Sequence, residues 1–195
     1  SLSGTKSCKS WDKLLIEPLL QHYGIKTYWL DVVDNVWVAN YNCPGQAVIT
    51  GLKEKVDEAC DILSNSGARK LVKLNCSGPF HSPLLNKASE ELYKELENVN
   101  INKPEISYAI NVSGEVINPE DDADVRTNLK NQITSSVRFK QSLVAMNENN
   151  VDLFIEIGPG KTINGFLRKT FGNDVAVLNV ATVEDVMKAK AIIDE

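Results

Sequence analysis

KLNCSGPFHSPLL, residues 73–85, joins a predicted strand to a predicted helix and carries one of the two histidines of the chain. The strand covers residues 71–75, and the helix begins with Ser82 as N-cap and Pro83 at its first position, a combination typical of helix N-termini. His81 therefore lies at a strand-to-helix junction, where loops often carry catalytic side chains. Local capping or packing also explains a single junction histidine, so its spacing alone leaves both interpretations open.

The composition is that of a globular protein and argues against two classes of partner. The chain has 195 residues, of which 43% are hydrophobic and 24% charged, enough for one domain with a sizeable core. Its net charge of −5 argues against a nucleic-acid partner, which needs clustered Lys and Arg. No apolar run reaches the roughly 18 residues of a membrane span, so we expect no membrane partner. The scattered cysteines lack metal-site spacing, which predicts a cytoplasmic protein with reduced thiols and no metal.

Hydrophobic patterning outlines the elements on either side of this junction. Residues 11–22 have the apolar spacing of a helix, although a proline lies inside the segment. Residues 36–74 indicate a strand, a turn, a second strand, an amphipathic helix and a third strand. Helices are also predicted over residues 82–97, with an inward apolar face, and over residues 120–133. Strands and helices alternate from about residue 105, which favours an α/β layer with parallel strands.

Four blocks of sequence occur in an order that is specific for one enzyme family. They are VANYNCPGQAVITG (38–51), SGPFHSPLL (77–85), NQITSSVRF (131–139) and FIEIGPGKTINGFLRK (154–169). With these blocks in register, the chain resembles the C-terminal two-thirds of malonyl-CoA:acyl-carrier-protein transacylases. Four ordered blocks are far more specific than any one of them.

The resemblance implies an α/β fold with two parts. We expect an incomplete α/β-hydrolase-like acyltransferase lobe together with a small ferredoxin-like subdomain. Residues 1–35 would then be an unmatched N-terminal segment, residues 36–76 the ferredoxin-like subdomain and residues 77–195 the C-terminal part of the larger lobe.

The resemblance also implies a reaction and its residues. Malonyl would move from coenzyme A to the pantetheine thiol of acyl carrier protein, for fatty acid biosynthesis and without a further cofactor. A serine holds malonyl as an ester, and a histidine accepts and returns the serine proton. By motif His81 is this base, and Gln132 supplies the main-chain carbonyl that orients it. Phe80 would leave less room for an α-methyl group and so favours malonyl. Asn42 matches a position near the acyl pocket, although turn chemistry explains it equally well.

The nucleophile motif of the family, Gly-His-Ser-x-Gly, does not occur in the 195 residues. Without that serine no ester can form, so we expect this chain alone to be inactive. Two alternatives stay open. One is a non-catalytic relative that binds carrier protein or coenzyme A. The other is an unrelated enzyme with Cys76 as nucleophile beside His81, which requires an exposed thiol with a lowered pKa.

Two further features invite a functional interpretation. Gly160-Lys161-Thr162 resembles the end of a phosphate loop, but Ile155 stands where that motif needs its first glycine. A structural turn is the better interpretation, although a helix N-terminus in this place could hold an anion. Arg138 would lie near the mouth of the site, facing coenzyme A phosphates, carrier-protein acids or only solvent.

Overall fold

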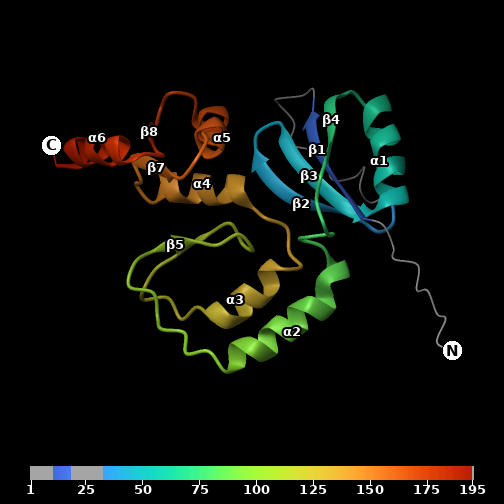
Figure 1. The fold of residues 1–195 in the computed structure, drawn as a ribbon, viewed down its shortest axis with the longest axis horizontal. Coiled ribbons are helices and arrows are strands. Elements are labelled where there is room, and N and C mark those ends of the chain that lie inside the picture. Colours follow the sequence, from blue (N-terminus) through green and yellow to red (C-terminus); the bar gives the residue numbers. More distant parts are fainter. Residues whose placement is uncertain (1–10, 19–32, 195) are drawn as a thin grey trace.

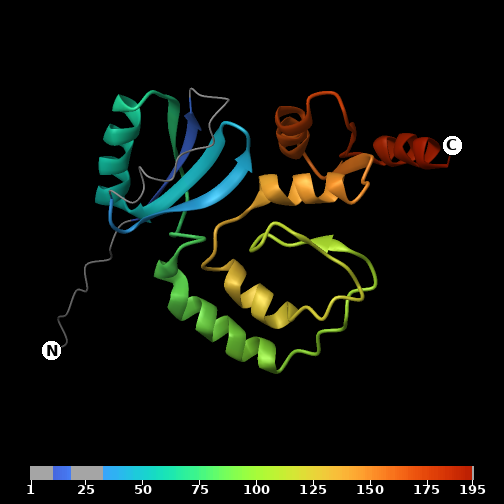
Figure 2. The ribbon, with the colours of Figure 1, turned by 180° about the vertical axis from the view of Figure 1, so that it is seen from behind.

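A computed structural model describes residues 11–18 and 33–194 of the chain. Figures 1 and 2 show an antiparallel sheet backed by one helix, a pair of helices below it, and a separate group of helices around a small parallel sheet. Within the described ranges, no helix has both the length and the apolar character that crossing a membrane would require.

The antiparallel sheet has the strand order β2-β3-β1-β4. Its strands are β1 (Trp11–Pro18), β2 (Val36–Cys43), β3 (Gln46–Leu52) and β4 (Ala68–Leu74). Every neighbouring pair is antiparallel. Pro44 and Gly45 form the tight turn between β2 and β3, with Gly45 at a φ of 74°, as expected for a Pro-Gly turn.

The prediction of a helix over residues 11–22 is wrong, because Trp11–Pro18 forms the strand β1. This strand lies between β3 and β4 and pairs with both. A proline inside a helix removes a hydrogen bond, whereas at a strand end beside a shift of register it is tolerated. The pairing of β1 with β4 shifts between Glu17 and Pro18. The rest of the expected helix lies outside the described residues.

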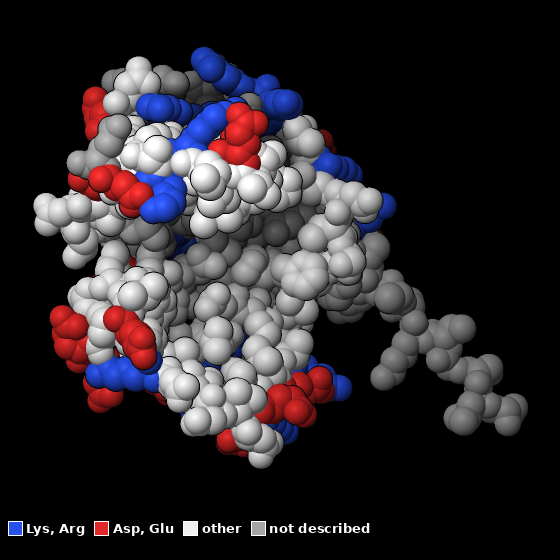
Figure 3. All heavy atoms as spheres, turned by 60° about the vertical axis from the view of Figure 1, so that its left-hand side comes forward, with Lys and Arg blue, Asp and Glu red and all other residues white. Residues whose placement is uncertain are grey.

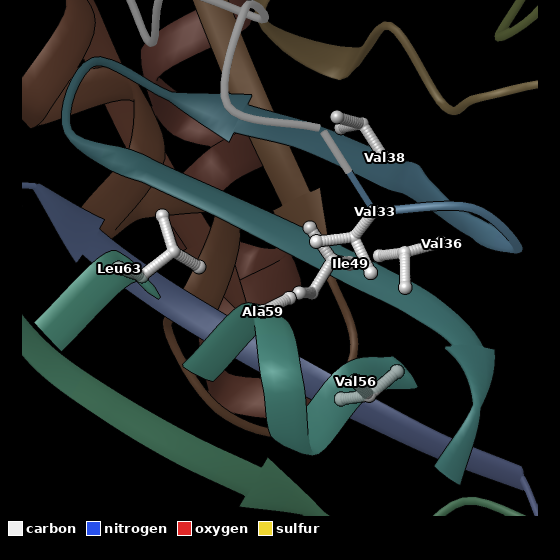
Figure 4. Close-up of a cluster of buried hydrophobic side chains, with 7 residues drawn as sticks. All are labelled: Val33, Val36, Val38, Ile49, Val56, Ala59 and Leu63. Carbon is white, nitrogen blue, oxygen red and sulfur yellow. The ribbon is translucent and has the colours of Figure 1, made fainter. Parts of the chain in front are cut away.

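One core fills the space between this sheet and the helix α1 (Lys53–Asn65). Figure 4 shows its side chains pointing toward one another from β2, β3, α1 and the segment just before β2. The cluster comprises Val33, Val36, Val38, Ile49, Val56, Ala59 and Leu63. The helix contributes Val56, Ala59 and Leu63, spaced three and four residues apart as one helical face requires. The amphipathic pattern of this helix is therefore confirmed.

Two helices lie side by side below the sheet (Figure 1). A short 3-10 turn (Pro83–Leu85) leads into α2 (Asn86–Glu97), and α3 (Val125–Gln132) packs along it. The helix α3 begins later than residue 120, because the Asp124 side chain accepts the backbone N–H of Thr127 and so forms the N-cap. The short strands β5 (Tyr108–Ala109) and β6 (Val116–Ile117) pair antiparallel in the connection from α2 to α3.

The parallel pairing that the alternating pattern predicts from about residue 105 is found in the last part of the chain, whereas β5 and β6 pair antiparallel. The elements of this last part are α4 (Phe139–Glu148), β7 (Leu153–Ile157), α5 (Thr162–Phe171), β8 (Ala176–Val180) and α6 (Val183–Ile193). The strands β7 and β8 pair parallel, with α5 as the connection between them. Leu143, Phe154, Leu167 and Val175 form the core of this part.

The Gly-Pro-Gly turn after β7 is a structural turn. The buried carboxylate of Glu156 accepts the backbone N–H groups of Ile163 at 3.0 Å and of Asn164 at 2.9 Å. These groups belong to the first turn of α5, so a side chain of the protein already occupies the helix N-terminus where an anion would bind. Asn179 closes the loop from the other side, donating to the carbonyl of Gly160 at 2.8 Å.

Replacing Glu156 by Gln should lower the free energy of unfolding by about 1–2 kcal/mol, because the charged acceptor of two N–H groups becomes a neutral one. Urea unfolding of both proteins measures this difference. Glu54→Gln is the control, since Glu54 is an exposed acid in the first turn of α1 and should change stability by no more than about 0.5 kcal/mol. Equal losses in the two variants would contradict a special role for Glu156.

Candidate active site

The loop from β4 to the 3-10 turn presents Phe80 and His81 in a constrained conformation. His81 has a φ of 63°, a left-handed conformation that is uncommon for residues other than glycine. The hydroxyl of the buried Ser82 donates to the carbonyl of Pro79 at 2.6 Å. Ser82 occupies the predicted N-cap position, but its side chain closes the loop instead of capping the helix. Such strained residues concentrate at functional sites.

His81 binds the C-terminal end of α3 with both its backbone and its ring. Its backbone N–H donates to the carbonyl of Ile133 at 3.1 Å, and its Nδ1 lies 2.9 Å from the carbonyl oxygen of Gln132. The last carbonyls of a helix have no partner within the helix, and His81 satisfies two of them at the end of α3. The histidine therefore has a packing role as well as the geometry of an oriented base.

The contact with Gln132 fixes which ring nitrogen carries the proton. A carbonyl oxygen only accepts hydrogen bonds, so Nδ1 of His81 must be the protonated donor. In the neutral ring Nε2 then holds the lone pair, and it is the nitrogen suited to accept a proton. The ring of His81 thus lies at the C-terminus of α3, an end of a helix that favours positive charge nearby.

The antiparallel sheet holds the segment that follows α3. Val137 donates to the carbonyl of Ala39 and accepts the N–H of Tyr41, each at 2.8 Å, and Ser136 donates its hydroxyl to the carbonyl of Val38 at 2.6 Å. These bonds attach residues 136–137 to the edge of β2. The end of α3, and with it the His81 ring, is thereby positioned by the sheet.

An open groove of about 600 Å³ runs beside His81 along α2 and α3. Its lining consists of Phe80, His81, Leu85, Ala88, Leu92, Leu96, Leu129, Gln132 and Ile133. The apolar face of α2 expected to point inward therefore lines a groove, and Ser89 is the residue of this helix that is buried. The groove can accept an apolar surface next to the histidine.

The structure brings together three of the four residues predicted for the site. Phe80, His81 and Gln132 share the groove, and the Phe80 side chain is 42% exposed. Asn42 does not join them: it lies at the end of β2, where its amide contacts the side-chain oxygen of Gln46 at 3.4 Å. The contact with Gln46 fits the interpretation of Asn42 as a turn residue. A role of Asn42 in acyl binding stays a prediction.

Cys76 and Arg138 lie outside the groove lining. Cys76 is half-buried in the loop before Phe80. Arg138 is exposed and is the N-cap residue of α4, and its backbone N–H donates to the carbonyl of Asn111 at 2.9 Å. Among the described residues, no group of three or more His, Cys, Asp or Glu side chains is arranged to hold a metal ion.

Acidification should weaken the N-terminal cap of α3, the helix that holds His81. The Thr127 hydroxyl that donates to Asp124 lowers the pKa of this carboxyl below its ordinary value of 3.8. A lowered pKa means that the contribution of the charge to stability is present above pH 3.8 and is lost as the pH falls below it. Urea unfolding of the wild type and of Asp124→Asn, a neutral cap, should therefore differ at neutral pH and converge in acid. A difference independent of pH would contradict this.

The sequence matches the acyl transferase domain family over residues 25–191. The chain belongs to this family. Among its acyl transferase relatives, the malonyl CoA-acyl carrier protein transacylase of Bacillus subtilis (strain 168) is 37% identical over 151 residues, which are 76% of this chain and 47% of the relative. The corresponding enzyme of Haemophilus influenzae is 35% identical over 157 residues, or 80% of this chain and 48% of the relative. The chain thus spans about half the length of the curated relatives it matches.

Solved acyl transferase structures agree with the fold. The malonyl CoA-acyl carrier protein transacylase of Clostridium perfringens has a TM-score of 0.82 at 31% identity, covering 94% of this chain and 57% of that one. A type II PKS acyl-carrier protein in complex with its malonyl-transacylase gives a TM-score of 0.83 at 27% identity, covering 93% and 58%. The family match begins at residue 25, ahead of the four blocks and within the segment 1–35 expected to be unmatched. The strand β1 of the same segment pairs within the sheet.

Proposed function

We propose that this chain supplies the general base of a malonyl-CoA:acyl-carrier-protein transacylase site, with His81 as base and Gln132 as the residue that orients it. The observation that carries the proposal is the 2.9 Å contact between Nδ1 of His81 and the Gln132 carbonyl beside an open groove. The similarity to curated malonyl CoA-acyl carrier protein transacylases supports it. The substrates would be malonyl-CoA and the pantetheine thiol of acyl carrier protein, with no further cofactor.

The reaction needs a serine, which would come from the region of the relatives that this chain does not match. Nε2 of His81 accepts the serine proton as the serine oxygen attacks the malonyl thioester, and it returns the proton to the departing coenzyme A thiolate. In the second step His81 accepts the proton of the pantetheine thiol, whose sulfur attacks the malonyl ester. The serine then leaves with that proton. Gln132 acts only through His81, by holding the ring and its tautomer.

The finer fold assignment belongs to the same proposal. The order β2-β3-β1-β4 with α1 on one face supports a ferredoxin-like subdomain that extends from β1 to β4. The parallel strands β7 and β8, connected by α5, support an α/β-hydrolase-like lobe for the remainder.

Two measurements test the proposed function. Intact-mass spectrometry of the 195-residue chain with malonyl-CoA should show no adduct, and a gain of one malonyl group would overturn the assignment of the nucleophile to another segment. A chimaera that carries this chain's aligned residues in place of the matched region of the Bacillus subtilis relative should transfer malonyl to pantetheinylated carrier protein. A folded but inactive chimaera would contradict the proposal.

The absence of Gly-His-Ser-x-Gly from the 195 residues favours one second candidate, a relative that binds carrier protein or coenzyme A without catalysis. If this candidate is right, titration calorimetry should show that the unmodified chain binds pantetheinylated carrier protein, and the chimaera should be inactive. An active chimaera would exclude it.

Phe80 is proposed to narrow the acyl site. Its ring lies over Gly78, where an added Cβ would stand 3.4 Å from the ring, and it flanks His81 in the groove. Phe80→Ala in the chimaera should raise the ratio of methylmalonyl to malonyl transfer by about tenfold, the effect of removing one steric element. Competition between the two coenzyme A thioesters measures this ratio, and an unchanged ratio would leave Phe80 as packing alone.

A further inference from the structure

We propose that Ser82 and Ser89 are positioning residues for the general base. The hydroxyl of Ser82 fixes the loop that carries His81, and the hydroxyl of Ser89 fixes the turn of α3 that carries the Gln132 carbonyl. Together they hold both partners of the 2.9 Å contact between Nδ1 and that carbonyl oxygen. This inference rests on the proposed function and adds two buried residues that act only through His81.

The side chain of Ser82 acts on the loop before it and leaves the helix after it uncapped. Serine at an N-cap normally accepts a backbone N–H of the following turn, but Ser82 makes no such bond. Its hydroxyl donates backward to the carbonyl of Pro79 at 2.6 Å. This bond closes the chain around His81, whose φ is 63°. A left-handed residue persists only where its surroundings constrain it strongly, and the Ser82 hydroxyl supplies one of these constraints.

Ser89 likewise departs from the bonding that its local position favours. A serine inside a helix normally points to solvent or donates to the carbonyl four residues before it. Ser89 lies inside α2 but donates across to α3, to the carbonyl of Lys130 at 2.9 Å. Lys130 belongs to the last turn of α3, which also contains Gln132. The bond therefore attaches the turn that faces the His81 ring to the helix that follows His81 in the chain.

Another buried serine shows the ordinary behaviour. Ser142 of α4 donates to the carbonyl of Arg138, four residues earlier, at 3.3 Å. Ser82, Ser89 and Ser142 are 0%, 3% and 2% exposed, so each hydroxyl must find its partner within the protein. Of these three, the two beside the contact between His81 and Gln132 are the ones that depart from the local pattern. Such departures are expected where function imposes a geometry.

The two bonds matter because the tautomer of His81 depends on the position of the Gln132 carbonyl. This carbonyl holds the proton on Nδ1 and so leaves the lone pair on Nε2. Hydrogen bonds weaken steeply as their geometry departs from the ideal, so movement of either the loop or the helix end returns the ring toward the mixture of tautomers in free histidine. A neutral ring with its proton on Nε2 cannot accept another there.

The first test is nitrogen-15 NMR of the imidazole rings in the full 195-residue chain, at a pH where they are neutral. His22 is the other histidine of the chain, and the spectrum of His81→Asn identifies its signals. We expect the unmodified chain to show His81 protonated at Nδ1. Ser82→Ala and Ser89→Ala should each shift both of its ring nitrogens toward the values of free histidine. Ser142→Ala, the matched control, should leave them unchanged.

The serine-to-alanine variants change no charge. Figure 3, which brings the left-hand side of Figure 1 forward, shows charged side chains gathered above and below a hollow of uncharged ones, and each of these variants keeps that pattern. A shift of the ring signals therefore reports hydrogen bonding and not a new neighbouring charge. Ser82→Cys retains a weaker donor and should lie between the unmodified chain and Ser82→Ala. It decides the test if circular dichroism shows that Ser82→Ala does not fold.

The second test is the rate of malonyl transfer by the chimaera. Ser82→Ala and Ser89→Ala should each lower kcat about tenfold and change the KM for malonyl-CoA less than about twofold, because they alter the orientation of the base and not substrate binding. The double variant should lose less than the product of the two single losses, since both hydroxyls support one hydrogen bond. Ser142→Ala should keep the activity of the parent chimaera.

The outcomes separate this inference from the proposed function. Unshifted His81 signals in either alanine variant would overturn the role of that serine, and an equal shift in Ser142→Ala would overturn both. An unchanged kcat despite shifted signals would also overturn the inference. An active chimaera whose ring signals do not respond would keep His81 as the base and remove the serines. If the parent chimaera is inactive while the signals shift, the proposed function fails but the serines still orient the ring.

Discussion

His81→Asn should lower the rate of malonyl transfer by the chimaera about 10²- to 10⁴-fold, the usual effect of removing a general base. Asparagine has no nitrogen able to accept a proton at the place of Nε2. It tolerates the left-handed φ of 63° that His81 adopts. Its amide also provides an N–H for the Gln132 carbonyl. The substitution therefore removes the base while retaining the packing role of the residue.

Stability measurements separate the two roles of His81. His81→Asn should unfold within about 1 kcal/mol of the unmodified protein in urea, whereas His81→Ala leaves the Gln132 carbonyl without its ring donor and should lose about 1–3 kcal/mol. Equal loss of activity in both variants, with unequal loss of stability, is the expected pattern. If the His81→Asn variant were fully active, His81 would only cap the helix, and the proposed mechanism would be wrong.

Residue spacing and turn composition predict correctly those elements whose sequence pattern is compatible with only one secondary structure. Val56, Ala59 and Leu63 repeat at helical spacing and are buried as one face of α1, and Pro44-Gly45 makes the expected turn. Residues 11–18 were misread because a short apolar run suits a strand as well as a helix, and partners in β3 and β4 decided the outcome. Local spacing does not contain those partners.

The candidate site needed information that no local pattern holds. His81 and Gln132 are 51 residues apart in sequence, so only the ordered blocks of the resemblance placed them together. No sequence pattern predicts the hydrogen bond from the Ser82 hydroxyl to the Pro79 carbonyl or the one from the His81 backbone N–H to the Ile133 carbonyl. Similarly, the spacing of Leu85, Leu92 and Leu96 identifies an apolar face but does not say what covers it, and the structure leaves that face open.

Gly51→Ala should lower the free energy of unfolding by about 3 kcal/mol, because the added methyl group would clash with backbone atoms, which cannot rotate away as a side chain can. An added Cβ would overlap the carbonyl oxygen of Asn35 and stand 3.1 Å from the Cα of Val36. Gly51 pairs with Val36 across β2 and β3. The strand β2 carries the bonds to Val137, so relief of the clash by moving this strand would also disturb the end of α3 that holds His81.

Gly165→Ala is the matched control, and it should have the opposite sign. Gly165 lies inside α5, and an added Cβ there has no other atom within 4 Å. Alanine in an open helical position stabilises a protein by about 0.4–1 kcal/mol relative to glycine. Urea unfolding of both variants measures the contrast, and the ring signals of His81 in NMR report whether its surroundings move. If Gly51→Ala cost no more than about 0.5 kcal/mol, the close approach of Asn35 to β3 would be wrong.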